Sequence, residues 1–301
     1  MRHPIEGEPL AFAGPGPLPP EPIIKAPVLL ARAGGTPKIP TMSRLIPSRL
    51  LSAGLIAIAA LFTAQAASAQ LLRSEDKYAN ITTNGFTIYN NVWGLKPAPG
   101  PQQLWVYGYN NWGVKAYHTD FGIKSYPNVS KYIGRQISSI AKLDSKFSVS
   151  TPSGGAWAVT YDIWDKAKGE ELMLWFNHTG DSNGGGVPRP ISSRWGNGNA
   201  LPAQAPDGSE LRNISIGNNT WNIYRGKNGN TNVYSFVRTS KTNSAYVDIR
   251  AILNFLRTDS RTRWIGDFIV GDVQHGFEIT NCGSSATNRA EFKFTSYDLW
   301  Q

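Results

Sequence analysis

Along residues 80–301, apolar and polar side chains alternate with a period of two, the pattern of strands that bury one face. The alternation is clearest in seven stretches: 86–94, 103–109, 113–119, 156–164, 171–176, 267–280 and 290–300. Two further strand-like stretches, 221–225 and 232–237, flank the sequence GKNGN and predict a hairpin. Aromatic and β-branched strands separated by Gly and Asn turns predict an all-β sandwich.

One segment has the period of a helix instead. In residues 248–259, Ile249, Ile252, Leu253 and Leu256 recur at the spacing of a helix face, and Asp248 is placed to cap its start. We therefore expect a single amphipathic helix packed on the sandwich. Residues 80–301 contain no internal repeat and no linker, which indicates one domain.

The first part of the chain has a different character. Residues 42–69 begin with a short basic region, continue with an apolar run from about Leu50 to Phe62, and end in small residues. This is the pattern of a secretory signal peptide with cleavage before Gln70, and the apolar run is shorter than the roughly 20 residues of a membrane span. Residues 1–41 are rich in Pro and Gly and predict a disordered extension or a leader from a misassigned start codon. The predicted mature domain is 70–301, extracellular or periplasmic and with no membrane segment.

Composition and charge narrow the possible functions. The chain has 301 residues, of which 17% are charged and 11% aromatic, too apolar for a disordered protein. Its net charge of +9 falls to +6 without residues 1–69, which hold six Lys or Arg and three Glu. The remaining charge is scattered, so a nucleic-acid partner is not expected, whereas anionic cell-wall material could attract it.

The cysteine and histidine content gives no sign of a disulfide or a metal site. Cys282 is the single cysteine, so no intrachain disulfide can form, and an inert, partly buried thiol is favoured over a reactive nucleophile. The four His are dispersed without the spacing of zinc ligands. We therefore expect neither a metal nor a cofactor.

Two predicted strands each present an acid on one face. In residues 170–180, one face carries Glu171, Met173 and Trp175, and the opposite face carries the apolar residues Leu172, Leu174 and Phe176.

In residues 273–280, Glu278 shares a face with Gln274 and Gly276, while Phe277 and Ile279 point the other way. Gly276 is expected to leave room beside the acid. Asp162 has the parity of Trp164 and is expected on the same surface.

Acids beside Trp, Met and Gln predict a polar groove with aromatic walls, which suits a sugar chain. A carboxylate at the head of a strand is, however, often only a solvated end residue, and the pairing of Glu171 with Glu278 as catalytic groups stays a hypothesis on spacing alone.

Seven strings in the chain occur in the order and approximate spacing of a known family. They are YNNVWG (89–94), IKSYPN (123–128), YDIW (161–164), ELMLW (171–175), GGGVPRPI (184–191), WNIYRGKNGNTNVYSF (221–236) and VQHGFEI (273–279). On these strings, residues 80–301 resemble glycoside hydrolase family 12, the secreted endo-β-1,4-glucanases and xyloglucan-active glucanases. The resemblance implies a jelly-roll β-sandwich of two curved antiparallel sheets with a concave substrate cleft.

The resemblance also implies roles for individual residues. Glu171, and not Glu170, matches the nucleophile, Glu278 matches the acid/base, and Asp162 matches the Asp that orients the nucleophile. Asn91, Trp93, Met173 and Trp175 match positions that line the sugar subsites, and Gln274 shares the face of Glu278. The implied reaction is a retaining double displacement on a β-glucan of the plant cell wall by a monomer, without metal or cofactor.

Alternatives remain open at this point. A xylanase on a related jelly roll is one, and a non-catalytic glucan-binding module or a wall-loosening protein is another. The chain lacks the disulfide that many family members carry near the amino terminus, and its segment 184–213 is long. Such loops are expected to form the cleft rims and to set substrate preference.

Overall fold

The structure is a computed structural model that describes residues 69–94, 98–119, 122–180 and 189–301. The predicted leader (1–41) and signal peptide (42–69) lie outside the described residues, apart from Ala69. Within the described residues, no helix combines the length and the apolar character that a membrane crossing requires.

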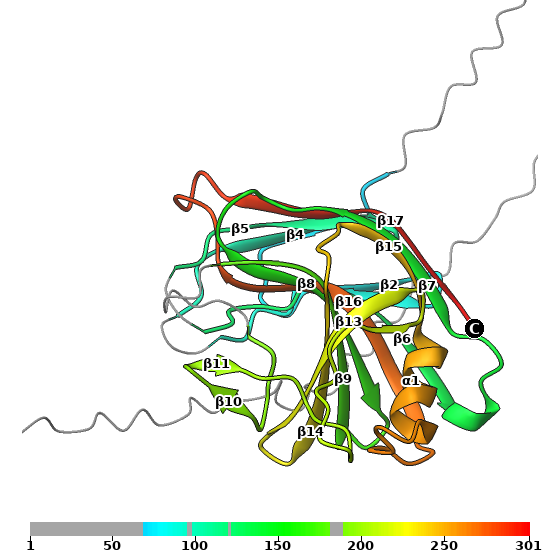
Figure 1. The fold of residues 1–301 in the computed structure, drawn as a ribbon. Coiled ribbons are helices and arrows are strands. Elements are labelled where there is room, and N and C mark those ends of the chain that lie inside the picture. Colours follow the sequence, from blue (N-terminus) through cyan, green and yellow to red (C-terminus); the bar gives the residue numbers. More distant parts are fainter. Residues whose placement is uncertain (1–68, 95–97, 120–121, 181–188) are drawn as a thin grey trace, which may run out of the picture. The chain divides into compact units, whose positions relative to one another are not determined.

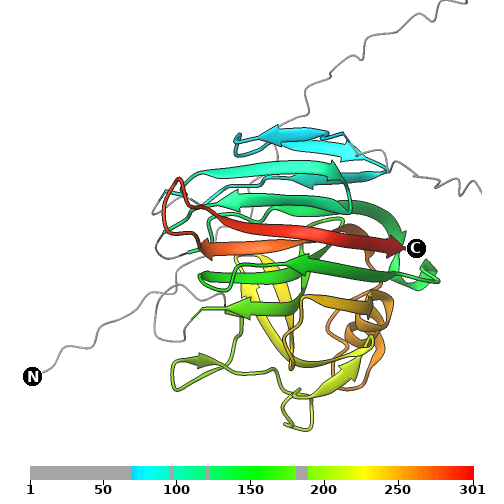
Figure 2. The same ribbon diagram turned by 90° about the horizontal axis from the view of Figure 1, so that it is seen from above.

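Nearly all strands of the described residues belong to two large β-sheets (Figure 1). Sheet A has the strand order β1 (Leu72–Ser74), β4 (Gln102–Gly108), β5 (Asn111–Ala116), β17 (Ala290–Trp300), β7 (Asp144–Ser150) and β15 (Ser244–Asp248). All its neighbouring strands are antiparallel. Figure 2 shows β17, in red, lying between strands from much earlier in the chain.

Sheet B carries the candidate site. Its strand order is β12 (Ile214–Ile216), β13 (Asn219–Asn228), β14 (Thr231–Arg238), β9 (Glu170–Thr179), β8 (Ala156–Asp165), β16 (Ile269–Asn281), β6 (Asn128–Gln136), β3 (Phe86–Tyr89) and β2 (Asn80–Thr83). The pair β9 and β14 is parallel, which departs from the purely antiparallel sheets implied by the resemblance, whereas the other neighbouring pairs are antiparallel.

Three short elements and a helix complete the described fold. The short elements are β10 (Trp195–Gly196), β11 (Asn199–Ala200) and the 3₁₀ turn η1 (Ile137–Ser139). Helix α1 (Ile249–Thr258) contacts β7, β12 and η1. The Asp248 side chain accepts a hydrogen bond from the Ala251 backbone N–H at 2.8 Å, which confirms the predicted cap.

The core lies between the two sheets and is strongly aromatic. Trp112 of β5 stacks on Phe294 of β17 at 4.7 Å between ring centroids and meets the edge of Phe277, on β16 of sheet B, at 6.0 Å. Phe147 of β7 makes a similar edge contact with His275 of β16, at 4.4 Å between ring centroids. Because each strand sends alternate side chains into this layer, the other set points out of the sandwich. The predicted sandwich with one packed helix is confirmed.

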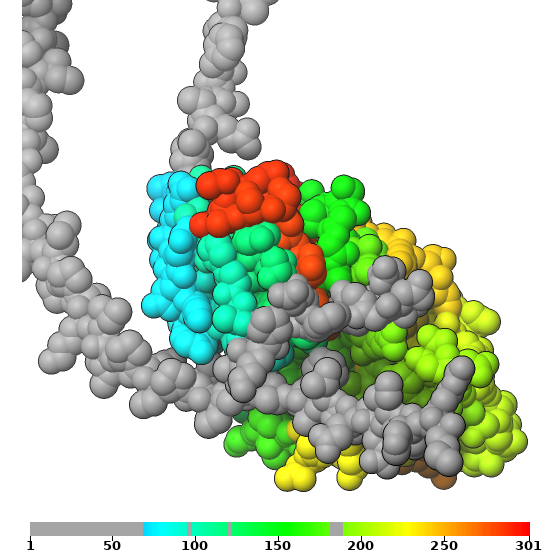
Figure 3. Space-filling model, turned by 90° about the vertical axis from the view of Figure 1, so that its left-hand side faces the viewer, coloured from blue at the N-terminus to red at the C-terminus, as the bar shows by residue number. Residues whose placement is uncertain are grey.

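Several strands were not expected from the sequence. Among these are β6, which contains Lys131, Gly134 and Arg135, and β7, in which three of the seven residues are Ser. The predicted strand 86–94 ends at Tyr89, after which Val92 forms only an isolated bridge with Ser125. Figure 3 shows the C-terminal segment, in red, beside the blue-green β5 region with which β17 pairs. Pairing partners so distant in sequence give little local signal for the shorter strands.

Candidate active site

Three carboxyl groups lie on the face of sheet B that points away from the core. Asp162 of β8 stands opposite Met173 of β9 and Gln274 of β16, and Glu171 stands opposite Trp164. Residues directly opposite each other in a ladder share a face of the sheet. Leu172, on the other side of β9, is part of the core between the sheets. The predicted face of β9 is therefore confirmed.

Glu278 completes this group from β16, where it stands opposite Ala158. Its neighbours Phe277 and Ile279 are fully buried in the core, as the alternation predicted. Asp162, Glu171 and Glu278 are 6%, 7% and 7% exposed, so all three carboxyls are largely withdrawn from water. We call them the carboxyl cluster.

Burial is the main influence on the acidity of the carboxyl cluster. It raises the pKa of Asp162 to about 7, against attraction from Lys168 and hydrogen bonds from Thr160 and Tyr126. Burial also raises the pKa of Glu171 well above its ordinary value, and repulsion from Asp162 and Glu278 raises it further. For Glu278, burial and then the charge of Asp162 raise the pKa. The cluster therefore holds protons at a pH where exposed carboxyls are ionised.

The hydrogen bonds of the cluster are unequal. Asp162 Oδ1 accepts a bond from Thr160 Oγ1 at 3.4 Å, whereas Glu278 Oε2 is buried without a partner among the described residues. Trp175 Nε1, Ser235 Oγ and Asn128 Oδ1 are also buried without a partner there. Buried polar atoms are normally paired.

The ladder positions put these atoms on the same face as the cluster. Ser235 stands opposite Met173, which in turn stands opposite Asp162. Trp175, two residues after Met173 on β9, stands opposite Thr160. Asn128 stands opposite Gly276 on β16. The face therefore offers both donors and acceptors to a ligand rich in hydroxyl groups.

The predicted binding residues fall into two groups. Met173 and Trp175 belong to the face of the cluster, where they pack with Ala158 and Val233. Gln274 stands next to Asp162 and is half-buried.

Asn91 and Trp93 lie instead on the segment after β3. Asn91, whose φ is 44°, donates from Nδ2 to the Tyr126 carbonyl at 3.1 Å, so its side chain holds the loop before β6. Trp93 is half-buried, and its backbone N–H donates to the Lys124 carbonyl at 3.0 Å. The contacts described for Trp93 do not bring its indole to the carboxyl cluster.

Tyr126 is a residue of the site that sequence reasoning missed. It is 5% exposed, and its hydroxyl donates to the Thr160 carbonyl at 3.3 Å. A hydrogen bond between Tyr126 and the Asp162 carboxyl lowers the pKa of Asp162, while burial and the charges of Asp162, Glu278 and Glu171 raise the pKa of Tyr126 itself. The string IKSYPN contains Tyr126, but a loop residue has no strand parity that would have revealed its direction.

Lys168, in the turn between β8 and β9, was also missed. Its Nζ pairs with Asp272 at 2.7 Å and lies 5.0 Å from the centre of the Trp164 ring. Its positive charge lowers the pKa of both Glu171 and Asp162, which opposes the effect of burial. The short charged turn thus supplies a cation to the site.

Gly276 has a different role from the one expected. A Cβ added there would lie 2.1 Å from the Pro127 carbonyl oxygen and 2.8 Å from the Asn128 Cα. The expectation of free space beside Glu278 is wrong, because the segment 126–128 fills it. Glycine at this position lets the loop with Tyr126 lie directly against β16.

Replacement of Gly276 by Ala is therefore expected to destabilise the fold by about 3 kcal/mol, since backbone atoms must move to admit the methyl group. Urea unfolding followed by tryptophan fluorescence measures this. Gly266→Ala is the matched control, because a Cβ there meets nothing within 4 Å. Equal stability of the two variants would contradict the close approach.

Neither a metal site nor a reactive thiol is found in the part of the chain that the structure describes. No group of three or more His, Cys, Asp or Glu there could hold a metal ion. Cys282 is 1% exposed, and burial raises the pKa of its thiol to about 12. This agrees with the inert thiol favoured from the sequence.

Comparison with known proteins gives one consistent family. The family model described as glycosyl hydrolase family 12 matches residues 84–299. The xyloglucanase domain of NopAA, a type three effector from Sinorhizobium fredii solved with cellobiose, is 39% identical with a TM-score of 0.68, over 76% of this chain and 98% of that one.

Two curated relatives are more distant. Endoglucanase S of Pectobacterium parmentieri is 27% identical over 65% of this chain and 76% of its own length. A xyloglucan-specific endo-beta-1,4-glucanase A of Emericella nidulans is 28% identical over 64% and 79%, respectively. Because the family match spans both sheets and all three carboxyls, the chain belongs to glycosyl hydrolase family 12 and is a glycoside hydrolase.

Proposed function

We propose that the protein is an endo-β-1,4-glucanase that cleaves internal bonds of a β-glucan by a retaining double displacement. The observation that carries the proposal is the buried carboxyl cluster, with two glutamates on one face of sheet B. The names of the relatives favour a β-1,4-glucan backbone, with xyloglucan as the first substrate to test.

In the first step, the Glu171 carboxylate attacks the anomeric carbon while Glu278 donates its proton to the leaving glycosidic oxygen. A covalent glycosyl-enzyme forms, and the negative charge of Glu171 is lost. In the second step, Glu278, now a carboxylate, takes a proton from water, whose oxygen attacks the same carbon and releases Glu171. Each carboxyl ends in its starting protonation state.

The cluster explains how one acid can be ionised while its neighbour keeps a proton. The raised pKa of Glu278 keeps its proton available near neutral pH. Lys168 favours a negative charge on Glu171 or Asp162. In the reactive form we place the negative charge on Glu171, and Asp162 beside it acts as a positioning residue.

Reducing-sugar release from carboxymethylcellulose, barley β-glucan, xyloglucan and xylan tests the function. Hydrolysis of at least one β-1,4-glucan supports the proposal and identifies the preferred polymer. Release from xylan alone would make the protein a xylanase. A folded protein that binds a glucan without releasing sugar would instead be a non-catalytic binding module.

Asp162→Asn is expected to shift the alkaline limb of the kcat/KM profile to lower pH. Above pH 7, Asp162 is negative and raises the pKa of Glu278, which prolongs its protonation. An uncharged Asn removes that effect, so Glu278 loses its proton at lower pH. The pH of half-maximal kcat/KM on the alkaline side is the measurement.

The matched control for this charge is Asp298→Asn, which removes a carboxylate from β17 of sheet A. Its pH profile is expected to superimpose on that of the parent. An unchanged alkaline limb in Asp162→Asn would show that Asp162 does not influence the acid/base group.

We also propose that the protein is exported and acts as a monomer on plant cell-wall glucan. The support is the signal-peptide pattern of residues 42–69 and the absence of a Lys/Arg run that would favour nucleic acid as the partner. N-terminal sequencing of the exported protein tests this, with Gln70 as the expected first residue. Light scattering tests the monomer.

A further inference from the structure

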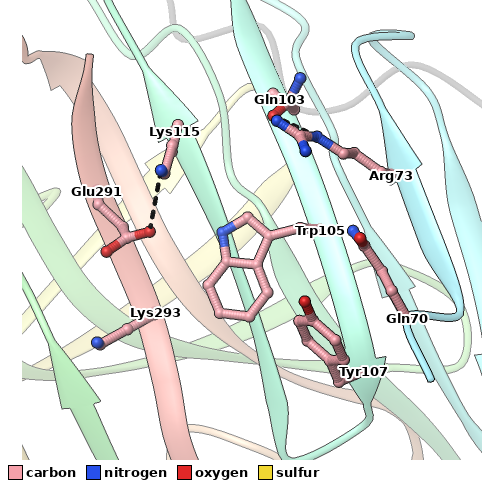
Figure 4. A pocket seen from close by; sticks show the side chains of 8 residues that line it. All are labelled: Gln70, Arg73, Gln103, Trp105, Tyr107, Lys115, Glu291 and Lys293. Atoms are coloured by element: carbon pink, nitrogen blue, oxygen red, sulfur yellow. Dashed lines mark hydrogen bonds and ion pairs between the residues drawn. The ribbon is translucent and has the colours of Figure 1, made fainter. Parts of the chain in front are cut away.

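The outer face of sheet A, on the far side of the core from sheet B, carries a hollow of about 330 Å³. Figure 4 shows the side chains that line it: Gln70, Arg73, Gln103, Trp105, Tyr107, Lys115, Glu291 and Lys293. A second hollow of about 430 Å³ shares Arg73, Gln103, Lys115 and Glu291 with it and extends to Glu75 and Arg289. Because the two share these residues, they form one continuous groove across β1, β4, β5 and β17, which we call the outer groove.

Trp105 forms an aromatic platform in the outer groove. It stands opposite Gly113 in the ladder, with Arg73 on its other side. A Cβ at Gly113 would lie 2.7 Å from Trp105 Cζ2 and 2.9 Å from the Lys293 Cβ, so the indole covers the bare backbone of that glycine. Figure 4 shows the indole face-on over the strands.

Tyr107 extends this platform along β4. Its ring meets that of Trp105 at 5.9 Å and an angle of 63°, and it is 37% exposed. Two adjoining rings that are held against a sheet and set at an angle to each other provide two apolar ring faces with a hydroxyl at the edge.

Several of the charged side chains in the outer groove have a partner within the groove. Arg73 Nε donates to Gln103 Oε1 at 2.9 Å, and Lys115 lies 3.8 Å from Glu291. At the other end, Arg289 pairs with Glu75 at 2.7 Å. Because the four cations Arg73, Lys115, Lys293 and Arg289 outnumber the carboxylates Glu75 and Glu291, the comparison with a polyanion is part of the test below.

We propose that the outer groove is a second binding site for the backbone of a neutral β-1,4-glucan. Pyranose faces stack on Trp105 and Tyr107, and hydroxyls bond to the side-chain amides of Gln70 and Gln103 and to Arg73. Two adjoining hollows of about 330 and 430 Å³ give the groove room for more than one sugar. The identity of the polymer rests on the proposed function, since the substrate chain is the glucan that the enzyme meets.

The position of the outer groove determines what it does. Trp105 points out of sheet A, whereas Glu171 points out of sheet B, so one sugar cannot occupy both sites. A long polymer held in the groove keeps its other segments near the carboxyl cluster at a raised effective concentration. An oligosaccharide of a few sugars gains nothing from the groove.

The test compares the full-length parent with Trp105→Ala on a long soluble glucan and on a cello-oligosaccharide. KM for the polymer is expected to rise by about 3- to 10-fold with kcat unchanged, as the loss of one aromatic stacking contact implies. Both constants for the oligosaccharide stay as in the parent. Trp300→Ala, which removes a 39% exposed indole of β17 outside the groove, is the matched control.

Each other outcome has a defined meaning. A parent that cleaves glucan but loses no polymer affinity in Trp105→Ala overturns the outer site and leaves the proposed function intact. A parent inactive on every glucan refutes the proposed function, and binding of the polymer by parent and variant then decides the groove separately. If Trp105→Ala unfolds, Tyr107→Ser applies the same comparison, and equal KM values overturn the site. Tighter binding of polygalacturonate than of glucan to the groove also overturns it.

Discussion

Glu171→Gln is expected to lower kcat for glucan hydrolysis by about four orders of magnitude, the scale at which removal of a nucleophile acts. The amide cannot attack the anomeric carbon, so no glycosyl-enzyme forms. Its size is nearly that of the acid, so the packing beside Trp164 and Val233 is retained. Initial rates of reducing-sugar release at saturating substrate measure the effect.

The neighbouring acid is the matched control. Glu170 faces the other way, where its carboxylate accepts hydrogen bonds from Tyr234 at 2.8 Å and from Asn232 at 3.1 Å. Glu170→Gln should therefore keep kcat within about threefold of the parent, because it touches no group of the carboxyl cluster. A larger loss of kcat in Glu170→Gln than in Glu171→Gln would show that Glu171 is not the nucleophile.

Thermal unfolding shows that the Glu171→Gln protein is folded and checks its electrostatics. Burial and neighbouring acids raise the pKa of Glu171 above its unfolded value, so the native state binds more protons between these two pKa values. The parent thus loses stability as pH rises through that window, and the neutral amide avoids the loss. The Tm of Glu171→Gln is expected to equal that of the parent near pH 4 and to exceed it near pH 8.

Glu278→Ala is expected to lower polymer hydrolysis by about three orders of magnitude, within the range of general acid catalysis. A sugar alkoxide needs a proton to leave, whereas a dinitrophenolate does not. With 2,4-dinitrophenyl β-cellobioside, the variant should therefore still form the glycosyl-enzyme and release a burst of dinitrophenolate. Turnover then stops at the second step, which needs Glu278 as a base.

The burst separates the two glutamates. Glu171→Gln should release no dinitrophenolate from the same substrate, because its first step is blocked. Glu210→Ala, which removes a half-buried acid paired with Arg194 and Arg212, should behave like the parent. If Glu278→Ala shows no burst and loses activity equally on both substrates, Glu278 is not the acid.

The sequence alone predicted the features that depend on neighbours along the chain. The alternation in β9 and β16 assigned Glu171 and Glu278 to one kind of face, and the sheet confirms this. The helix 248–259 and its Asp248 cap were predicted because a helix is stabilised by contacts within four residues. Resemblance in seven strings added the family.

Only the tertiary structure decided which distant segments meet. The parallel pairing of β9 with β14, the position of Tyr126 among the carboxyls and the filling of the space at Gly276 join residues far apart in sequence. Likewise, the outer groove needs β1, β4, β5 and β17 side by side. Strand parity gives the direction of a side chain, but the neighbours that bury it and set its pKa follow from long-range pairing that a local pattern does not contain.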